Sequence, residues 1–295
     1  MSSLWIRENQ DYERACIVTC ALSGVVANRA QCPGIPYTPE EYAAEARRAY
    51  EAGAAVVHIH ARTPDGAPSY DVADYRNIYD AVTDACPVII NFSTGAINIT
   101  TDQKTAHIRA IKPALGALNM GSMNYAKYNA QKKSFVFEFV FPNPFSEIVE
   151  IVKAMNDVQT KPELECFDLG HVGNSLPLID MGLLQPPYQY SLILGVVGGV
   201  PPTIPNLVTM VNMLPPQSEW EIIGISLDQW RLIAGATALG GNVRVGLEDN
   251  FYVRKGVMAD SNGQLVEKAV RMIRDQGREP ATVDECRNRL NLVNR

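Results

Sequence analysis

Eight short runs rich in β-branched and other apolar residues recur along this chain of 295 residues, and a segment with helical character follows each run. This alternation is typical of parallel sheets, because the connection between two parallel strands is usually a helix. The pattern predicts strands at 17–23, 55–61, 87–92, 115–120, 163–168, 190–196, 220–225 and 242–247. Eight strand–helix units over about 250 residues predict an α/β fold, the (β/α)8 TIM barrel.

The helical segments complete this prediction. Helices are expected at 39–51, 72–84, 102–111, from Ser146 onward, 175–183, 204–213, 227–239, 262–276 and 282–291. The first has the clearest start, with Thr38 as N-cap, Pro39 at the first position and Glu41 completing a capping box. Residues 121–144, which hold the aromatic run 135–141, form a longer excursion. We expect one domain over 1–295, with an N-terminal arm (1–15) and a C-terminal helical extension.

An open, doubly wound sheet is the alternative arrangement of these elements. No G-x-G-x-x-G motif follows the first strand, and polar residues stand at the carboxyl ends of many strands. The active sites of TIM barrels lie at that end of the strands, so this distribution favours the barrel.

Composition excludes several classes of protein. The formal charge is −6, the isoelectric point is near 5.3 and no basic run exists, which disfavours nucleic-acid binding. No apolar segment approaches the ~20 residues of a membrane span, and no signal peptide begins the sequence. The cysteines lack C-x-x-C pairing, which predicts reduced, structural thiols and a cytoplasmic location. They are Cys16, Cys20, Cys32, Cys86, Cys166 and Cys286.

The second strand carries two histidines. His58, His60 and Arg62 alternate along it, so their side chains share one face. Only four histidines occur in the chain, and two imidazoles at positions i and i+2 of a rigid strand make half of a metal site. The alternative is a pair of core histidines hydrogen-bonded to backbone carbonyls.

The eighth strand supplies a carboxylate for the same site. In a closed barrel the eighth strand lies beside the first and near the second, so Glu248 would stand close to His58 and His60. Two histidines and a carboxylate leave positions open on a catalytic Zn²⁺. Asp249 could act as a general base, and Arg244 could orient it or bind a substrate carboxylate. The alternatives are a solvated loop pair for 248–249 and a structural Arg–Asp ion pair.

Polar residues at the ends of the third and fourth strands suggest a substrate pocket. Ser93, Thr94 and Gly95 could form a small anion or carboxylate pocket, and Asn119 and Ser122 end the next strand in a similar way. Ordinary turn chemistry explains the same residues equally well.

Two further motifs give weaker signals. Glu165 and His171 flank the end of the fifth strand; a histidine bonded to backbone is favoured over a metal ligand there. The glycines of 198–203 resemble a phosphate-binding loop without its lysine, or make only a tight turn.

The motifs together resemble one enzyme family. His-x-His-x-Arg in the second strand, Ser-Thr-Gly after the third, and Val-Arg-Val-Gly-Leu-Glu-Asp-Asn at 243–250 are similar to those of the β-keto acid cleavage enzymes. The resemblance runs from about residue 17 to residue 250. It implies a zinc-dependent barrel, usually a homotetramer, that turns a β-keto acid and acetyl-CoA into acetoacetate and a new acyl-CoA by Claisen and retro-Claisen chemistry.

The resemblance also implies roles for individual residues. His58, His60 and Glu248 would bind zinc, Asp249 assisted by Arg244 would be the base, and the 93–94 hydroxyls would hold the substrate carboxylate.

The chain departs from the pattern at one place. Family members that cleave the aminohexanoate substrate carry an acidic residue just after the glycine of the first strand. Here Val25, Val26 and Ala27 stand there, which predicts a neutral or apolar β-keto acid.

Three other functions compete with this one. They are a metal-dependent hydrolase, a metallo-lyase or aldolase that does not use CoA, and a metal-binding structural barrel without activity. Hydrolases on this barrel normally need histidines in the fifth and sixth strands, and 190–196 has none.

Overall fold

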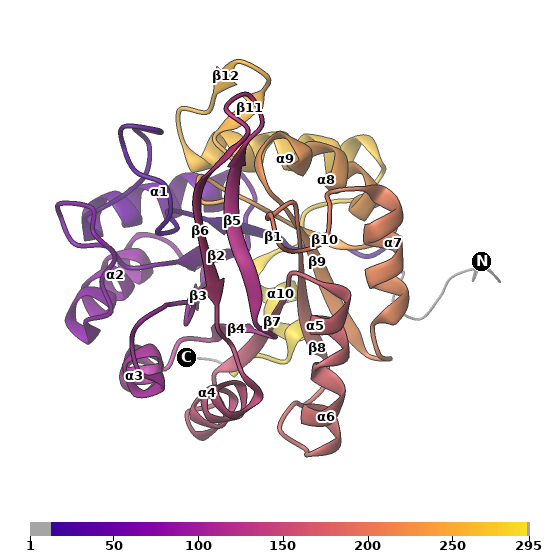
Figure 1. Cartoon of the computed structure of the whole chain (residues 1–295). Helices are drawn as coiled ribbons and strands as arrows, with labels where there is room; N and C mark the ends of the chain where they lie inside the picture. The colour runs from indigo at the N-terminus through magenta and orange to yellow at the C-terminus, as the bar shows by residue number, and fades with distance from the viewer. Residues whose placement is uncertain (1–12, 294–295) are drawn as a thin grey trace.

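The computed structural model describes residues 13–293, and eight parallel strands of that range close into a barrel (Figure 1). Their order around the barrel is β1-β10-β9-β8-β7-β4-β3-β2. The strands are β1 (Val18–Ala21), β2 (Val56–Ile59), β3 (Ile89–Phe92), β4 (Leu115–Asn119), β7 (Lys161–Cys166), β8 (Tyr188–Leu194), β9 (Ser218–Gly224) and β10 (Asn242–Val245). The predicted (β/α)8 barrel is therefore confirmed.

Helices surround the barrel and follow most of the expected ranges. They are α1 (Pro39–Glu51), α2 (Val72–Ala85), α3 (Thr101–Ile111), α4 (Phe145–Asp157), α5 (Leu169–Gly173), α6 (Ser175–Asp180), α7 (Ile204–Met213), α8 (Gln229–Ala238), α9 (Asn262–Asp275) and α10 (Val283–Leu290), with a 3₁₀ turn at η1 (Ser226–Asp228). The Thr38 capping box of α1 is confirmed, since the Thr38 side chain accepts from the Glu41 backbone and the Glu41 carboxylate accepts from the Thr38 backbone.

Several predicted helix boundaries differ from the structure by one to three residues, and two of them have a clear physical reason. Helix α4 begins at Phe145 rather than Ser146, because the extended backbone of Pro144 serves as N-cap without a side-chain hydrogen bond. The helix expected over 175–183 is shorter: α6 ends at Asp180, and Gly182 turns the chain with a φ of +70°.

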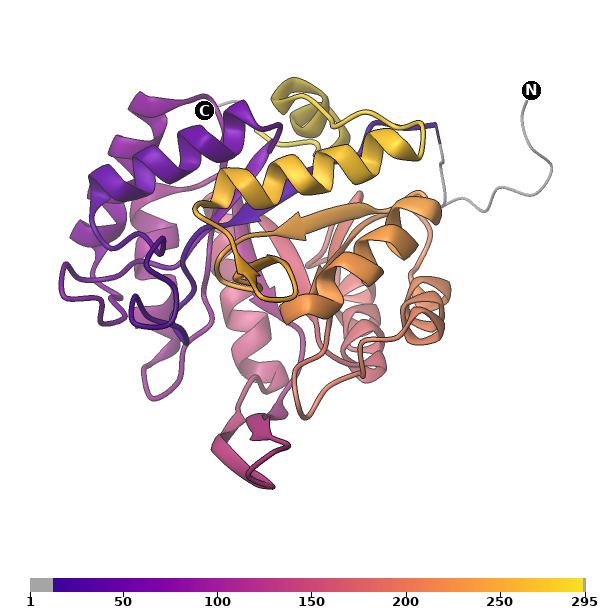
Figure 2. The same cartoon turned by 90° about the horizontal axis from the view of Figure 1, so that it is seen from above.

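The excursion at 121–144 is an antiparallel β-hairpin of β5 (Met123–Asn129) and β6 (Ser134–Phe141). In Figure 1 the hairpin crosses the front of the barrel, and in Figure 2 it projects beyond the surrounding helices. At its base, Met123 and Phe141 pack with Phe167, Ile193 and other apolar side chains of the β7, β8 and β9 region. A second small ribbon pairs β11 (Tyr252–Arg254) with β12 (Val257–Met258).

The ends of the chain were predicted in outline. The last two helices lie where they were expected, and α10 packs Cys286 and Leu290 beneath residues of β2, β3 and β4. Residues 1–12 of the predicted arm lie outside the described range. None of the helices within 13–293 has the length and apolar character that crossing a membrane requires.

Barrel closure places the predicted site. Strand β1 pairs with β10 on one side, with Thr19 beside Arg244, and with β2 on the other, with Ala21 beside His58. The end of β10 therefore lies one strand away from the histidines of β2, as the sequence predicted.

Candidate active site

Three potential metal ligands meet at the carboxyl ends of β2 and β10. His58 Nε2 lies 3.7 Å from one carboxylate oxygen of Glu248, and His60 Nε2 lies 3.4 Å from the other. All three ligand atoms lie within 4.8 Å of one another, and no other such group of three occurs within residues 13–293. These separations exceed ordinary hydrogen bonds and suit ligands that each stand about 2 Å from one ion.

A glycine allows Glu248 to reach this position. Gly246 has a φ of +138°, and a β-carbon there would lie 2.1 Å from the Ala21 carbonyl oxygen. Only glycine fits so close to β1, and the chain then turns so that the Glu248 backbone N–H donates to the same carbonyl. Asn262 holds the turn by accepting from the Leu247 N–H.

Polar atoms without hydrogen-bond partners indicate that the His58, His60 and Glu248 cluster is suited to a metal ion. His58 is fully buried, yet neither ring nitrogen has a hydrogen-bond partner in the described part of the chain, and Glu248 Oε2 has none either. Burial, followed by the charge of Arg244, lowers the pKa of His58 well below its usual value. Burial alone would raise the pKa of Glu248, but Arg244 and the two histidines hold it well below its usual range. A neutral imidazole beside an ionised carboxylate is the form that binds Zn²⁺.

Arg244 holds Asp249 in a two-point contact beside the cluster. Its Nε and Nη2 donate to Asp249 Oδ2 and Oδ1 at 3.0 and 3.1 Å, and Nη2 lies 3.0 Å from Glu248 Oε1. Burial raises the pKa of Asp249 to about 6, although the charge of Arg244 opposes the rise. An oriented, buried carboxylate with a pKa near neutrality suits proton transfer.

Three buried carboxylates lie near this pair: Glu165, which the sequence analysis named without a role, and Glu163 and Glu221, which it did not name. Glu165 lies 3.4 Å from Arg244 Nη1, and Ser191 bridges Glu163 and Glu221 by hydrogen bonds. Burial raises the pKa of Glu165 and of Glu221 to about 8. The signal was present, because Glu163 and Glu165 alternate on one strand as the histidines do.

Some of the polar residues that follow β3 and β4 lie close together. Gly95 N donates to Ser93 Oγ, and a β-carbon on Gly95 would lie 3.2 Å from Asn119 Nδ2. The Thr94 hydroxyl donates to the Ala117 carbonyl of β4. Ser122 accepts from the Asn143 N–H at the base of the hairpin. Ser93, Gly95 and Asn119 thus form one polar group, while the Thr94 and Ser122 side chains contact backbone.

The remaining motifs have structural contacts. His171 Nδ1 accepts from the Phe167 N–H, which agrees with the interpretation of this histidine as backbone-bonded. Arg62 donates to carbonyls of the β1–α1 loop, among them that of Gly24. A β-carbon on Gly198 would lie 1.8 Å from the Asn124 carbonyl, so this glycine admits the hairpin backbone.

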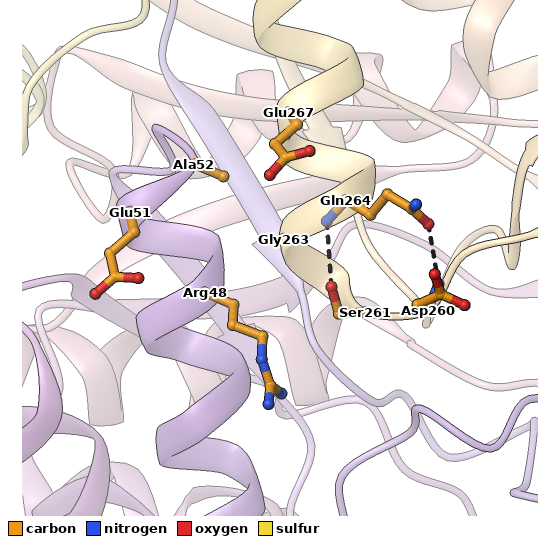
Figure 3. A pocket seen from close by; sticks show the side chains of 8 residues that line it. All are labelled: Arg48, Glu51, Ala52, Asp260, Ser261, Gly263, Gln264 and Glu267. Carbon is orange, nitrogen blue, oxygen red and sulfur yellow. Dashed lines mark hydrogen bonds between the residues drawn. The ribbon is translucent and has the colours of Figure 1, made fainter.

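A separate hollow of about 370 Å³ lies outside the barrel, between α1 and α9 (Figure 3). Half of its eight lining residues are charged, namely Arg48, Glu51, Asp260 and Glu267, and Gln264 accepts a hydrogen bond from the backbone N–H of Asp260. None of the predicted site residues lines it, so it is not the candidate active site.

The fold and the site define a (β/α)8 barrel enzyme with a candidate metal centre at the carboxyl ends of its strands. The family model for beta-keto acid cleavage enzymes matches residues 15–292, and the chain belongs to that family. The resemblance drawn from the three motifs is therefore confirmed.

Two curated relatives and one solved structure illustrate this similarity. The 3-keto-5-aminohexanoate cleavage enzyme of Fusobacterium nucleatum subsp. nucleatum is 36% identical over 277 residues, which cover 94% of this chain and 97% of the relative. The 3,5-dioxohexanoate:acetyl-CoA acetone transferase of Paraburkholderia graminis is 30% identical over 299 residues, 95% of this chain and 96% of the relative. The binary complex of ObcA with oxaloacetate aligns with a TM-score of 0.75 at 21% identity, covering 88% of this chain and 68% of that one, and shows the shared fold.

Proposed function

We propose that this enzyme converts a β-keto acid and acetyl-CoA into acetoacetate and a new acyl-CoA. The observation that carries the proposal is that the histidine–carboxylate cluster and the Arg244–Asp249 pair lie together in a member of this family. The two named relatives act on β-keto acids, and one name includes acetyl-CoA.

The products fix which bonds change. Acetoacetate keeps the carboxylate and the adjacent carbon of the β-keto acid and gains the acetyl group. That carbon must lose a proton and bond to the thioester carbonyl carbon, and the CoA thiolate leaves. The thiolate then attacks the original keto carbon, the bond between that carbon and its carboxylate-bearing neighbour breaks, and the carbanion of acetoacetate takes back a proton.

Asp249 would be the base that removes and returns this proton. Its two oxygens face the guanidinium of Arg244, which fixes their orientation and stabilises the ionised form. The burial of both side chains keeps water away from the carbanion.

His58, His60 and Glu248 would hold Zn²⁺, as the unpaired nitrogens and the donor set support. When bound, the ion supplies a positive charge that polarises the keto oxygen and stabilises negative charge developing there.

The ends of β3 and β4 would bind the carboxylate of the β-keto acid. Ser93, Thr94 and Gly95 would contribute hydroxyl and backbone donors, and Asn119 and Ser122 an amide and a hydroxyl. The Thr94 hydroxyl and the Gly95 N–H would exchange their present acceptors, the Ala117 carbonyl and Ser93 Oγ, for the carboxylate. The contact of Gly95 with Ser93 and the closeness of Asn119 support this assignment for three of the five residues.

The β1–α1 loop favours a neutral or apolar substrate. A β-carbon on Gly24 would lie 2.6 Å from Glu248 Cγ, so the loop passes directly beside the metal cluster. The next residues are Val25, Val26 and Ala27, which offer no carboxylate to a substrate ammonium. Desolvating an unpaired ammonium there would be costly.

Location and assembly belong to the same proposal. We expect one domain over residues 1–295. We expect a cytoplasmic location, because the six cysteines are free and buried. We expect a homotetramer, as the resemblance to the family implies.

The test is an assay of the purified protein for acetoacetate, dependent on acetyl-CoA, over a panel of neutral, anionic and cationic β-keto acids, together with elemental analysis for zinc. Acetoacetate formed from neutral β-keto acids supports the proposal. Its absence with every β-keto acid overturns the proposal, and turnover of amino or trimethylammonio substrates alone rejects the neutral substrate class. Hydrolysis that releases a free carboxylic acid in the absence of CoA would favour a hydrolase. Cleavage of the β-keto acid that does not require acetyl-CoA would favour a lyase, and a lack of any activity would favour a structural barrel.

A further inference from the structure

The β5–β6 hairpin carries a surface that the proposed chemistry leaves unused. One face of the hairpin holds a row of aromatic rings, Tyr125, Phe137 and Phe139. Tyr125 and Phe139 pack against the apolar cluster over β7, β8 and β9, at the same carboxyl end of the barrel as the candidate site. The hairpin therefore lies at the same end of the barrel as that site, and Figure 1 shows it crossing the front of the barrel.

The inner end of the row lies within electrostatic reach of the site. Burial and then the charges of Glu248, Asp249 and Glu165 raise the pKa of Tyr125 to about 12. Phe139 lies opposite Tyr125 in the hairpin, with ring centroids 5.2 Å apart and planes inclined by 12°.

The outer end of the row leads to lysines. Lys127 lies opposite Phe137 on the same face, because residues 125 and 127 alternate in the same direction along β5. Lys132 and Lys133 follow in the turn at the tip, where the Asn129 side chain accepts from two backbone N–H groups. We call Lys127, Lys132 and Lys133 the basic tip. All three are exposed, and none forms an ion pair with any residue between 13 and 293.

The charge of the basic tip is unusual for this chain. The protein carries a net charge of −6, whereas the hairpin strands and turn hold three lysines and a single glutamate, Glu138. Glu138 lies opposite Ala126, on the other face of the ribbon. The face with the aromatic row is therefore free of acidic side chains, and it suits an anionic ligand.

On this basis we propose that the hairpin binds the nucleotide end of acyl-CoA, with the adenine against Phe137 and the phosphates at the basic tip. This inference rests on the proposed function, which requires a CoA thioester at the metal cluster. From Met123 to Asn129 the strand rises by six residues at about 3.3 Å each, or about 20 Å, which separates the strand ends from the tip. An extended pantetheine arm covers a comparable span, so the thioester reaches the site while the nucleotide lies on the hairpin.

The chemistry of the surface matches that ligand. An adenine ring stacks on an aromatic side chain, and Phe137 ends the row with part of its surface accessible. Lysine ammonium groups pair with phosphate oxygens as flexible point charges. The strand β6 has a bulge at Val136, so Phe135 does not lie on the same face as Phe137. Phe135 pairs with Tyr128 on the face opposite the aromatic row. Phe135 therefore serves as a matched control.

The test compares acetyl-CoA with acetyl-pantetheine, which lacks the nucleotide. In the wild type, kcat/KM for acetyl-CoA should exceed that for acetyl-pantetheine. We expect the triple variant K127Q/K132Q/K133Q to reduce this ratio about tenfold, as the loss of several exposed charge pairs implies. Phe137→Ala should reduce it as well. Calorimetry with desulfo-CoA should show a matching rise in Kd for both variants.

Phe135→Ala and Lys153→Gln are the controls, since Lys153 is an exposed lysine on α4. The inference is overturned if the triple variant keeps the wild-type ratio of kcat/KM values, or if the control variants reduce that ratio equally. It is also overturned if the triple variant changes the oligomeric mass of the protein and leaves the Kd for desulfo-CoA unchanged. Failure of the proposed function looks different: the wild type then forms no acetoacetate with either thioester.

Discussion

Arg244 and Asp249 lie five positions apart on one chain segment and meet through two hydrogen bonds, Nε to Oδ2 at 3.0 Å and Nη2 to Oδ1 at 3.1 Å. The turn at Gly246 makes this contact possible, because its positive φ folds the chain back over the end of β10. Both side chains are almost fully buried, so water does not compete with Arg244 for the Asp249 carboxylate. The geometry fixes one carboxylate in one orientation beside the metal cluster.

Asp249→Asn should remove the base and keep the shape. The amide still fits beside Arg244, but it cannot accept a proton, so kcat should fall at least ~100-fold. Zinc content and the thermal unfolding midpoint should stay close to those of the wild type. Steady-state kinetics with elemental analysis checks this, and an Asp249→Asn enzyme with more than a tenth of wild-type kcat would contradict the role of base.

Replacing a cluster histidine should remove the metal. His58→Ala leaves two ligands, and we expect the bound zinc to fall below detection and activity to fall at least ~100-fold. His171→Gln is the matched control, because His171 is also buried but accepts from a backbone N–H outside the cluster. Equal zinc content in His58→Ala and wild type, measured after dialysis, would show that the cluster does not hold the ion.

Gly24→Ala tests whether the β1–α1 loop positions Glu248. Gly24 has a φ of +55°, and its added β-carbon would meet Glu248 Cγ at 2.6 Å. Gly277 has a φ of +78°, and a β-carbon added there would meet no atom within 4 Å, so Gly277→Ala carries the backbone strain alone. Gly277→Ala should lose about 1 kcal/mol of unfolding free energy and Gly24→Ala at least as much, but only Gly24→Ala should bind zinc at least ~10-fold more weakly. Metal competition titrations decide this, and equal zinc affinities would count against the contact.

The sequence was sufficient to predict that His58, His60 and Glu248 lie together, because barrel topology determines which strands are neighbours. Alternation placed His58 and His60 on one face, and barrel closure brought the end of β10 to them. Closure of the barrel was the only assumption needed to predict that these residues lie close together.

The hairpin could not be predicted in the same way. Residues 135–141 are apolar on both faces apart from Glu138, so they show no alternation, and their partner strand is mostly polar. The turn between the strands contains neither glycine nor proline, the usual signals of a hairpin. Glu163 and Glu221 were missed for a different reason: glutamate is normally exposed, and only the closed barrel shows that they are buried.

His107 makes stability depend on pH outside the metal cluster. Its ring stacks on Tyr75 at 3.9 Å, its Nε2 donates to the Ser93 carbonyl, and burial lowers its pKa to about 4. The unfolded chain binds a proton near the ordinary value of 6.5, before the folded protein does, so this histidine costs stability as pH falls from 6.5 toward 4. At pH 5 the cost is about 2 kcal/mol. His107→Gln, although less stable at pH 7.5, should therefore lose about 2 kcal/mol less than the wild type between pH 7.5 and 5. Urea unfolding at both pH values measures this difference, and identical losses in the two proteins would refute the assignment.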